Sequence, residues 1–227
     1  MNAPTAPQEH FLVRGSPRPQ GAAAEARPGT FSEHLAANRY FDRNFQSDAV
    51  KILPGEYYVT ARDLVIVTVL GSCVSACIRD REKNIGGMNH FMLAEKGESN
   101  PVGASARYGA FAMEILINHL LKMGARRGAL EAKVFGGGRV MASLSSSQVG
   151  ENNARFVREY LKTEGIPVLA EDLLDVHPRK VYFFPASGRV LVKKLVRVHN
   201  ETIAARERAY AESLRGVPDG GEIELFT

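Results

Sequence analysis

Hydrophobic positions along the middle of the chain follow two periodicities, one typical of strands and one typical of helices. The run DLVIVTVL at residues 63–70 is apolar and mostly β-branched. Such a run predicts a central strand that is buried on both faces. Shorter apolar runs bounded by turn residues predict further strands at 74–80, 86–93, 131–138 and 166–172, and a hairpin at 179–196 around the turn PASG.

Helical spacing is clearest at residues 106–125, where apolar side chains recur every three or four positions and Gly124 marks the end. A second helix is predicted at 151–165. We interpret the preceding segment, SLSSSQVGENN, as a loop and helix start in which Ser147 or Gly150 is the cap.

The two ends of the chain are more polar than its middle. Residues 1–38 hold five of the eleven prolines and too few apolar side chains to offset the entropy of ordering, so a flexible tail is expected there. The segment HLAANRYFDRNFQ, 34–46, predicts a short helix or docking segment. A more charged helix is expected at 201–216, and GEIELF at 221–226 suggests a final short strand.

The order of these elements defines the expected fold class. Strands and helices mix without a regular βαβ alternation, which favours an α/β fold, a single-domain sandwich with a mixed β-sheet packed by helices. The length of 227 residues suits one domain. We therefore expect a tail at 1–38, a catalytic domain at 39–200, and a C-terminal helix with a short tail at 201–227.

Composition excludes several classes of protein. The net charge of +4 is mild and is not gathered into a Lys/Arg stripe, so nucleic-acid binding is not expected. No stretch of 18 apolar residues exists, so no membrane insertion is expected, and the N-terminus lacks the apolar core of a secretory signal. Two cysteines are too few for a secreted disulfide scaffold. These features indicate a cytoplasmic protein.

The turn GSC, directly after the first predicted strand, carries the candidate nucleophile Cys73. A sharp turn at Gly71 and Ser72 leaves backbone N–H groups outside any strand ladder, and such donors are what an oxyanion needs. A nearby imidazole would stabilise the thiolate. The alternative is a buried, inert thiol, since isolated cysteines are among the most buried residues.

His90, seventeen positions after Cys73, is the candidate base. Two adjacent strands joined by a short turn fit in that interval, so the two side chains could meet across a sheet. A third polar group should orient the imidazole; Thr68 is the nearest candidate in sequence, and Thr60 is a more distant one. The alternative is a hydrogen-bonded core histidine without a catalytic role.

The second cysteine, Cys77, raises a redox interpretation. Four residues along a strand separate the two Cα atoms by about 13 Å, which is beyond disulfide reach. We therefore expect Cys77 to be a packed thiol on the same face as Cys73. No metal is expected, because no second pair of ligands is suitably spaced. The triplet in FGGGRVM lacks the last glycine of a dinucleotide-binding motif and is typical of close backbone packing.

Five segments in order, LGSCVSACIRD, GGMNHFML, ARYGAFAMEIL, AKVFGGG and VGENN, resemble the CheD family of chemoreceptor glutamine deamidases over roughly residues 52–198. The resemblance implies a cytoplasmic chemotaxis enzyme that hydrolyses selected glutamine side chains of methyl-accepting receptors to glutamate, without a cofactor. It implies that Cys73 is the nucleophile and His90 the base. The third member is a threonine on the preceding strand, for which Thr68 is the candidate here. Donors around Gly71 and Ser72 would hold the oxyanion.

Two other classes of function stay open on the sequence. One is a non-catalytic module that docks on receptors or binds a CheC-type phosphatase, which the resemblance also names as a partner. The other is a thiol redox protein, which the Cys-x-x-x-Cys spacing disfavours.

Overall fold

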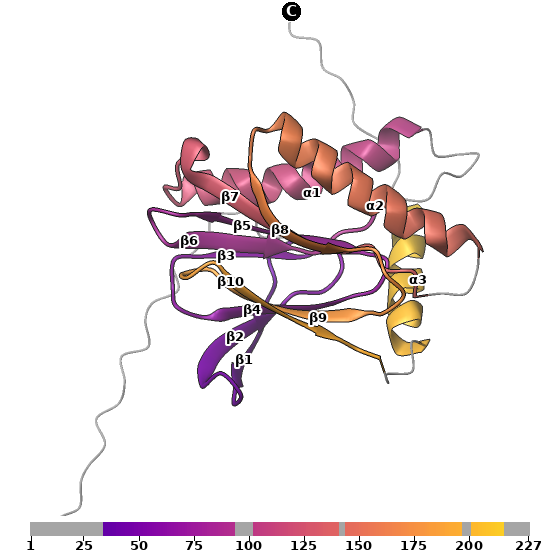
Figure 1. Ribbon diagram of the computed structural model, residues 1–227, viewed down its shortest axis with the longest axis horizontal. Helices are drawn as coiled ribbons and strands as arrows, with labels where there is room; N and C mark the ends of the chain where they lie inside the picture. The colour runs from indigo at the N-terminus through magenta and orange to yellow at the C-terminus, as the bar shows by residue number, and fades with distance from the viewer. Residues whose placement is uncertain (1–33, 94–101, 141–143, 197–200, 216–227) are drawn as a thin grey trace, which may run out of the picture.

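The computed structural model describes residues 34–93, 102–140, 144–196 and 201–215 (Figure 1). Two five-stranded sheets face each other, and the helices α1, Val102–Lys122, and α2, Leu144–Thr163, cover the outer face of one of them. The α/β sandwich predicted from the sequence is confirmed, and its strands are divided between two mixed sheets.

The sheet beneath the helices has the strand order β3-β6-β5-β7-β8. Its neighbours are antiparallel except for β7 and β8, which are parallel, because α2 connects them. A short 3₁₀ turn at Arg127–Ala129 leads into β7. The strands are β3 Tyr57–Thr60, β5 Val74–Asp80, β6 Ile85–Asn89, β7 Leu130–Gly136 and β8 Val168–Leu173.

The second sheet has the order β1-β2-β4-β9-β10, in which only β2 and β4 are parallel. The apolar run predicted as a central strand is β4, which lies in the middle of this sheet. The hairpin predicted around PASG is β9 and β10. The strands are β1 Asn38–Asp42, β2 Ser47–Lys51, β4 Val65–Leu70, β9 Arg179–Phe184 and β10 Arg189–Lys194.

Two apolar cores hold the three layers together. One lies between the helices and the first sheet and includes Met113, Leu116, Leu120, Val134 and Val157. The other lies between the two sheets and includes Ile66, Leu70, Cys73, Cys77, Met88 and Phe183. Each large side chain buried in this way contributes about 1.5–3 kcal/mol through removal from water.

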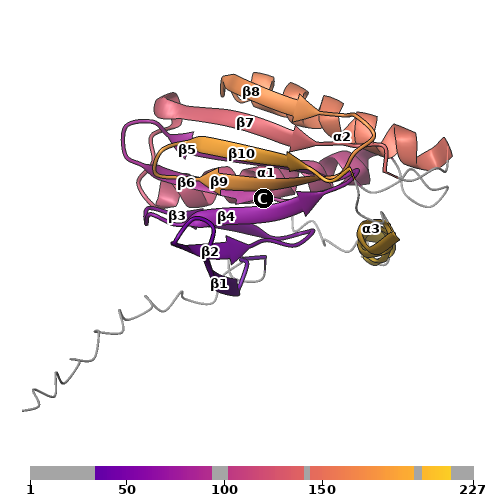
Figure 2. The same ribbon diagram turned by 60° about the horizontal axis from the view of Figure 1, so that its bottom comes forward.

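The crossing from one sheet to the other creates the site described below. Strand β4 belongs to the second sheet and β5 to the first, and only residues 71–73 connect them. The chain therefore turns sharply at one end of the sandwich. The third helix, α3, Glu201–Arg215, lies across that end, as Figures 1 and 2 show from two directions.

Two expectations about element boundaries are wrong. The segment 34–46 contains the strand β1 and not a helix, because residues 38–42 pair with β2 in an antiparallel hairpin. Helix α2 begins at Leu144, so Ser147 and Gly150 lie inside it and do not cap it. Gly150 serves close packing there, because an added Cβ would lie 2.5 Å from the carbonyl oxygen of Gly137.

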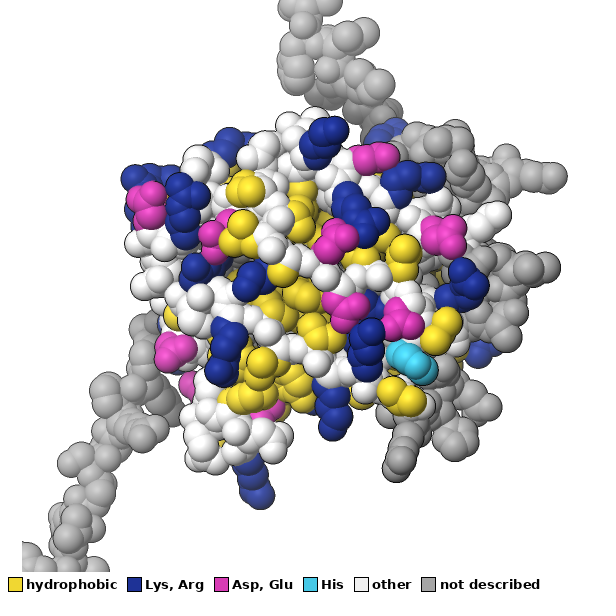
Figure 3. Space-filling model, in the orientation of Figure 1, with side chains coloured by type: hydrophobic (Ala, Val, Ile, Leu, Met, Phe, Trp, Pro, Cys, Tyr) yellow, Lys and Arg dark blue, Asp and Glu magenta, His cyan; other side chains and the backbone are white. Residues whose placement is uncertain are grey.

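Parts of the predicted ends fall outside the described residues, namely 1–33 of the tail and the strand expected at 221–226. Residues 34–36, at the edge of the expected tail, already pair with Tyr57. None of the described helices is long and apolar enough to cross a membrane. On the face in Figure 3, basic and acidic side chains alternate with apolar ones.

Candidate active site

The turn between β4 and β5 gathers three successive backbone donors at one point. The N–H groups of Gly71 and Cys73 donate to Oε1 of Glu207, at 2.9 and 3.2 Å. The N–H and the hydroxyl of Ser72 donate to Oε2 of the same carboxylate, at 3.0 and 2.7 Å. Consecutive N–H groups that converge in this way form an anion-binding nest. We call the donors of residues 71–73 the Cys73 nest.

The carbonyl groups of the turn explain why its N–H groups converge. Gly138 N donates to the oxygen of Gly71 at 2.6 Å, and Gly137 N donates to that of Cys73 at 2.8 Å. The oxygen of Ser72 accepts from Nδ2 of Asn153, at 2.8 Å. All three carbonyls are therefore held by the glycine loop after β7 and by α2. In a planar trans peptide the next N–H points away from each carbonyl, so the carbonyls of Gly71 and Ser72 direct the N–H groups of Ser72 and Cys73 to the opposite side.

His90 is held in one orientation by Thr68. The Thr68 hydroxyl donates to the carbonyl oxygen of Ile52 at 2.9 Å and lies 2.8 Å from Nδ1 of His90. A hydroxyl has a single proton, so its proton goes to Ile52 and the imidazole must donate from Nδ1. The neutral ring then carries its lone pair on Nε2, which has no hydrogen-bond partner among the described residues.

Cys73 and His90 lie on the same face of the first sheet. Val74 pairs with Phe91 in antiparallel register, which sets Cys73 opposite Met92 and His90 opposite Ser75. Cys73 and His90 are therefore diagonal neighbours, a relation that brings Cα atoms to about 7–8 Å and long side chains within reach. Both side chains face the second sheet, where Cys73 packs in the core between the sheets and the hydroxyl of Thr68 meets the His90 ring.

Burial keeps both reactive groups neutral. The Cys73 side chain is 0% exposed and that of His90 is 2% exposed. Burial raises the pKa of the Cys73 thiol, and the charge of Glu207 and a hydrogen bond to it raise this pKa further. Burial lowers the pKa of His90 to about 3, and the charge of Arg206 acts in the same direction. In this arrangement the pair is a thiol and a neutral imidazole.

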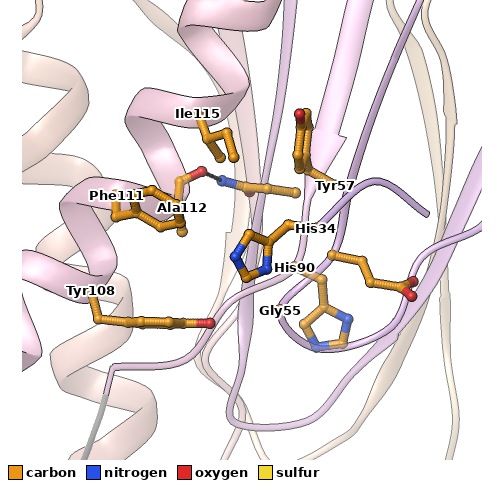
Figure 4. A pocket seen from close by; sticks show the side chains of 10 residues that line it. His34, Gly55, Tyr57, His90, Tyr108, Phe111, Ala112 and Ile115 are labelled. Carbon is orange, nitrogen blue, oxygen red and sulfur yellow. Dashed lines mark hydrogen bonds between the residues drawn. The ribbon is translucent and has the colours of Figure 1, made fainter. Parts of the chain in front are cut away.

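A pocket leads towards His90 from the side of α1. Figure 4 shows Tyr108 and Phe111 of α1 on one side of it and Tyr57 on the other, with His34 and His90 also in its lining. At its rim the Tyr108 hydroxyl contacts that of Tyr210, a residue of α3. Tyr108, which lines the pocket, therefore also contacts α3.

Cys77 is a packed thiol in the core between the sheets, on the same face as Cys73. It pairs with Met88 across the ladder and is buried, which raises the pKa of its thiol. Both cysteines are free. Within the described part of the chain, no three His, Cys, Asp or Glu side chains are grouped so that they could hold a metal ion.

Two residues of the site were not predicted from the sequence, Glu207 and Asn153. Asn153 is completely buried and joins two strand ends, since Nδ2 donates to Ser72 and Oδ1 accepts from the N–H of Leu93 at 2.8 Å. Helical spacing offered a signal for Glu207, because it shares a helix face with Ile203, Ala204 and Tyr210 and is the charged residue of that face.

Replacing Asn153 by alanine is expected to lower the free energy of unfolding by about 2–3 kcal/mol. The change leaves Ser72 O and Leu93 N without their partner, and unpaired buried polar groups are costly. Chemical denaturation measures the loss. The neighbouring Asn152→Ala removes only a contact with exposed Arg155 and is the control, with a change within about 0.5 kcal/mol. Equal effects of the two changes would contradict the assignment.

Comparison with known proteins identifies the family. The family model described as CheD chemotactic sensory transduction matches residues 92–194. The probable chemoreceptor glutamine deamidase CheD 1 of Dechloromonas aromatica (strain RCB) is 65% identical over 196 residues, 86% of this chain and 98% of that protein. Its counterpart in Herminiimonas arsenicoxydans is 61% identical over 197 residues, 86% of this chain and 97% of that protein.

Among solved structures, the hypothetical protein YfiH of Bacillus licheniformis is similar with a TM-score of 0.31 and 14% identity, over 53% of this chain and 49% of that one. That similarity is too weak to bear on fold or activity. The identity to the two curated relatives extends over nearly the whole of each of them. The chain belongs to the CheD family.

Proposed function

We propose that this protein hydrolyses glutamine side chains of chemoreceptors to glutamate, with Cys73 as the nucleophile and His90 as the base. The names of its relatives supply the reaction and the substrate. The observation that carries the mechanism is the Thr68–His90 hydrogen bond, which leaves the lone pair of the imidazole on Nε2, where it can act as a base.

The first half of the reaction forms a thioester. Nε2 of His90 takes the proton of the Cys73 thiol, and the thiolate attacks the amide carbon of the glutamine. The amide oxygen becomes an oxyanion, for which the Cys73 nest supplies N–H donors. As the C–N bond breaks, the imidazolium returns its proton to the departing ammonia. The low pKa of His90 makes the imidazolium a strong acid for this step.

The second half regenerates the enzyme. His90 takes a proton from water, the resulting hydroxide attacks the thioester carbon, and the C–S bond breaks. The product is a glutamate side chain, and the thiol regains its proton from the imidazolium. The sum is one amide and one water converted to one carboxylic acid and one ammonia, which ionise to carboxylate and ammonium.

Incubation with a receptor cytoplasmic fragment in ¹⁸O-enriched water tests the proposal. Hydrolysis of the thioester replaces NH₂ by ¹⁸OH, so each modified glutamine is expected to gain about 3 Da. In ordinary water the gain is about 1 Da. Peptide mass spectrometry locates the sites. Cys77→Ala is the control and should keep most of the activity, because Cys77 only packs in the core. Receptor binding without any mass gain would favour a docking module instead.

A further inference from the structure

Helix α3 presents a carboxylate where the reaction needs an anion to be stabilised. Glu207 is 3% exposed. Its two oxygens accept hydrogen bonds from the N–H groups of residues 71–73 and from the Ser72 hydroxyl. A buried charge is costly unless it is hydrogen-bonded. The donors of the nest supply the hydrogen bonds that the buried carboxylate needs, so Glu207 occupies the turn as a bound anion would.

The rest of the same helix face closes over the site. Ile203 and Ala204, one turn before Glu207, are buried, and Ala211, one turn after it, packs against the core between the sheets. Tyr210 contacts Tyr108 at the rim of the pocket. It also lies against Gly55, where an added Cβ would be 3.0 Å from the Tyr210 ring. Both Cys73 and the approach to His90 are therefore covered by α3.

The chemistry of Glu207 matches the product of the proposed reaction. Deamidation of a glutamine leaves a glutamate side chain, and a glutamate side chain on a helix is what occupies the Cys73 nest. The carboxylate lies close enough to the Cys73 thiol to raise its pKa through a hydrogen bond as well as through charge. An amide in that place would hold its carbon beside the sulfur and its oxygen beside the backbone donors.

We propose that α3 is an internal, product-like occupant of the substrate site, which a substrate helix must displace before it can react. This inference rests on the proposed deamidase function. It also defines what the surface beneath α3 accepts: a helix that carries glutamine at the position of Glu207, with small residues three before and four after it, as at Ala204 and Ala211. A bulky side chain at either position would meet the buried surface that these alanines contact.

The change Glu207→Gln turns the product-like side chain into a substrate, and this tests the proposal directly. In the purified full-length variant, we expect the introduced amide to be hydrolysed back to the acid, with a gain of about 1 Da in the peptide that contains position 207. The rate should be independent of protein concentration, because the reaction is within one molecule. Combining Glu207→Gln with Cys73→Ser should abolish the mass change. Glu212→Gln, on the exposed side of the same helix, is the matched control and should keep its amide.

The outcomes separate this inference from the function on which it rests. If the introduced amide at 207 persists while the same variant deamidates a receptor fragment, the deamidase function stands and the product-like role of α3 is wrong. If neither the amide at 207 nor the receptor is hydrolysed, the proposed function fails and the inference falls with it.

Glu207→Ala gives a second measurement that does not depend on hydrolysis. Without the carboxylate, α3 loses its hydrogen bonds to the nest, so iodoacetamide should alkylate Cys73 faster, on the order of 10-fold. A Cys77→Ala background makes the label report on Cys73 alone. Receptor deamidation should show a lower KM with little change in kcat. Glu212→Ala should leave both readouts unchanged, and an unchanged labelling rate in Glu207→Ala would contradict the occlusion by α3.

Discussion

Replacing Cys73 by serine is expected to abolish receptor deamidation while the fold stays intact. A serine hydroxyl has a far higher pKa than a thiol, and the weakly basic His90 cannot create an alkoxide from it. The rate should fall at least about 10³-fold, as is usual when a nucleophile is removed. The peptide mass assay measures the rate, and thermal unfolding measures the fold.

The structural cost of this change is small. Cys73 is enclosed, and serine is slightly smaller, so no overlap arises. Its hydroxyl can donate to the nearby Glu207 carboxylate in place of the thiol. A variant that unfolds at the temperature of the wild type and yet turns over no receptor supports the nucleophile assignment. Wild-type turnover by Cys73→Ser would remove Cys73 from the mechanism.

The elements that sequence patterns predicted are those whose stability is local or whose burial is uniform. The β4 run is apolar except for Thr68, and α1 buries apolar side chains at helical spacing from Met113 to Leu120. The β9–β10 hairpin carries its own turn. In contrast, β1 depends on pairing with β2, and the start of α2 contains serines, which favour caps when considered alone. The division into two sheets depends on the crossing at 71–73, which no periodicity reveals.

The candidate site divides in the same way. Thr68 lies in β4, Cys73 directly precedes β5 and His90 directly follows β6, so residue types and spacing were enough to suggest that they lie close together. Asn153 and Glu207 reach the same turn from α2 and α3, and such contacts depend on how distant elements pack. Asn153 is a buried amide and Glu207 is a glutamate on an apolar helix face. Neither can be assigned to the site until the position of the turn is known.

These distant residues act on the turn in opposite ways. Asn153 and the glycine loop fix the carbonyl groups of residues 71–73 and so hold the nest open for an anion before any ligand arrives. Glu207 fills that nest. The preorganisation that would stabilise an oxyanion is therefore also what binds α3, which explains how a helix with exposed charged side chains at Arg206, Arg208 and Glu212 docks on this surface.

Replacing Thr68 by valine is expected to lower turnover by about 10²-fold with a smaller effect on stability. Valine keeps the volume of threonine but cannot accept from Nδ1–H of His90, so the ring loses the partner that fixes its tautomer. The side chain faces the site and not the outer core, since its neighbours Val65 and Val67 pack on the opposite face of the sheet. The loss should appear mainly in kcat, because Thr68 acts through His90.

The matched variant Thr68→Ser separates orientation from packing. Serine restores the hydroxyl and removes only a methyl group, so it should recover most of the turnover that valine loses, although its stability falls. A merely structural role predicts the reverse order, in which valine preserves function better than serine does. The pH profile gives a further readout: when the ring is free to exchange tautomers, the apparent pKa of the base in kcat should move, whereas it should stay in place in Thr68→Ser. Turnover by Thr68→Val at the wild-type rate would show that the carbonyl of Ile52 and the surrounding strands hold the imidazole without this hydroxyl.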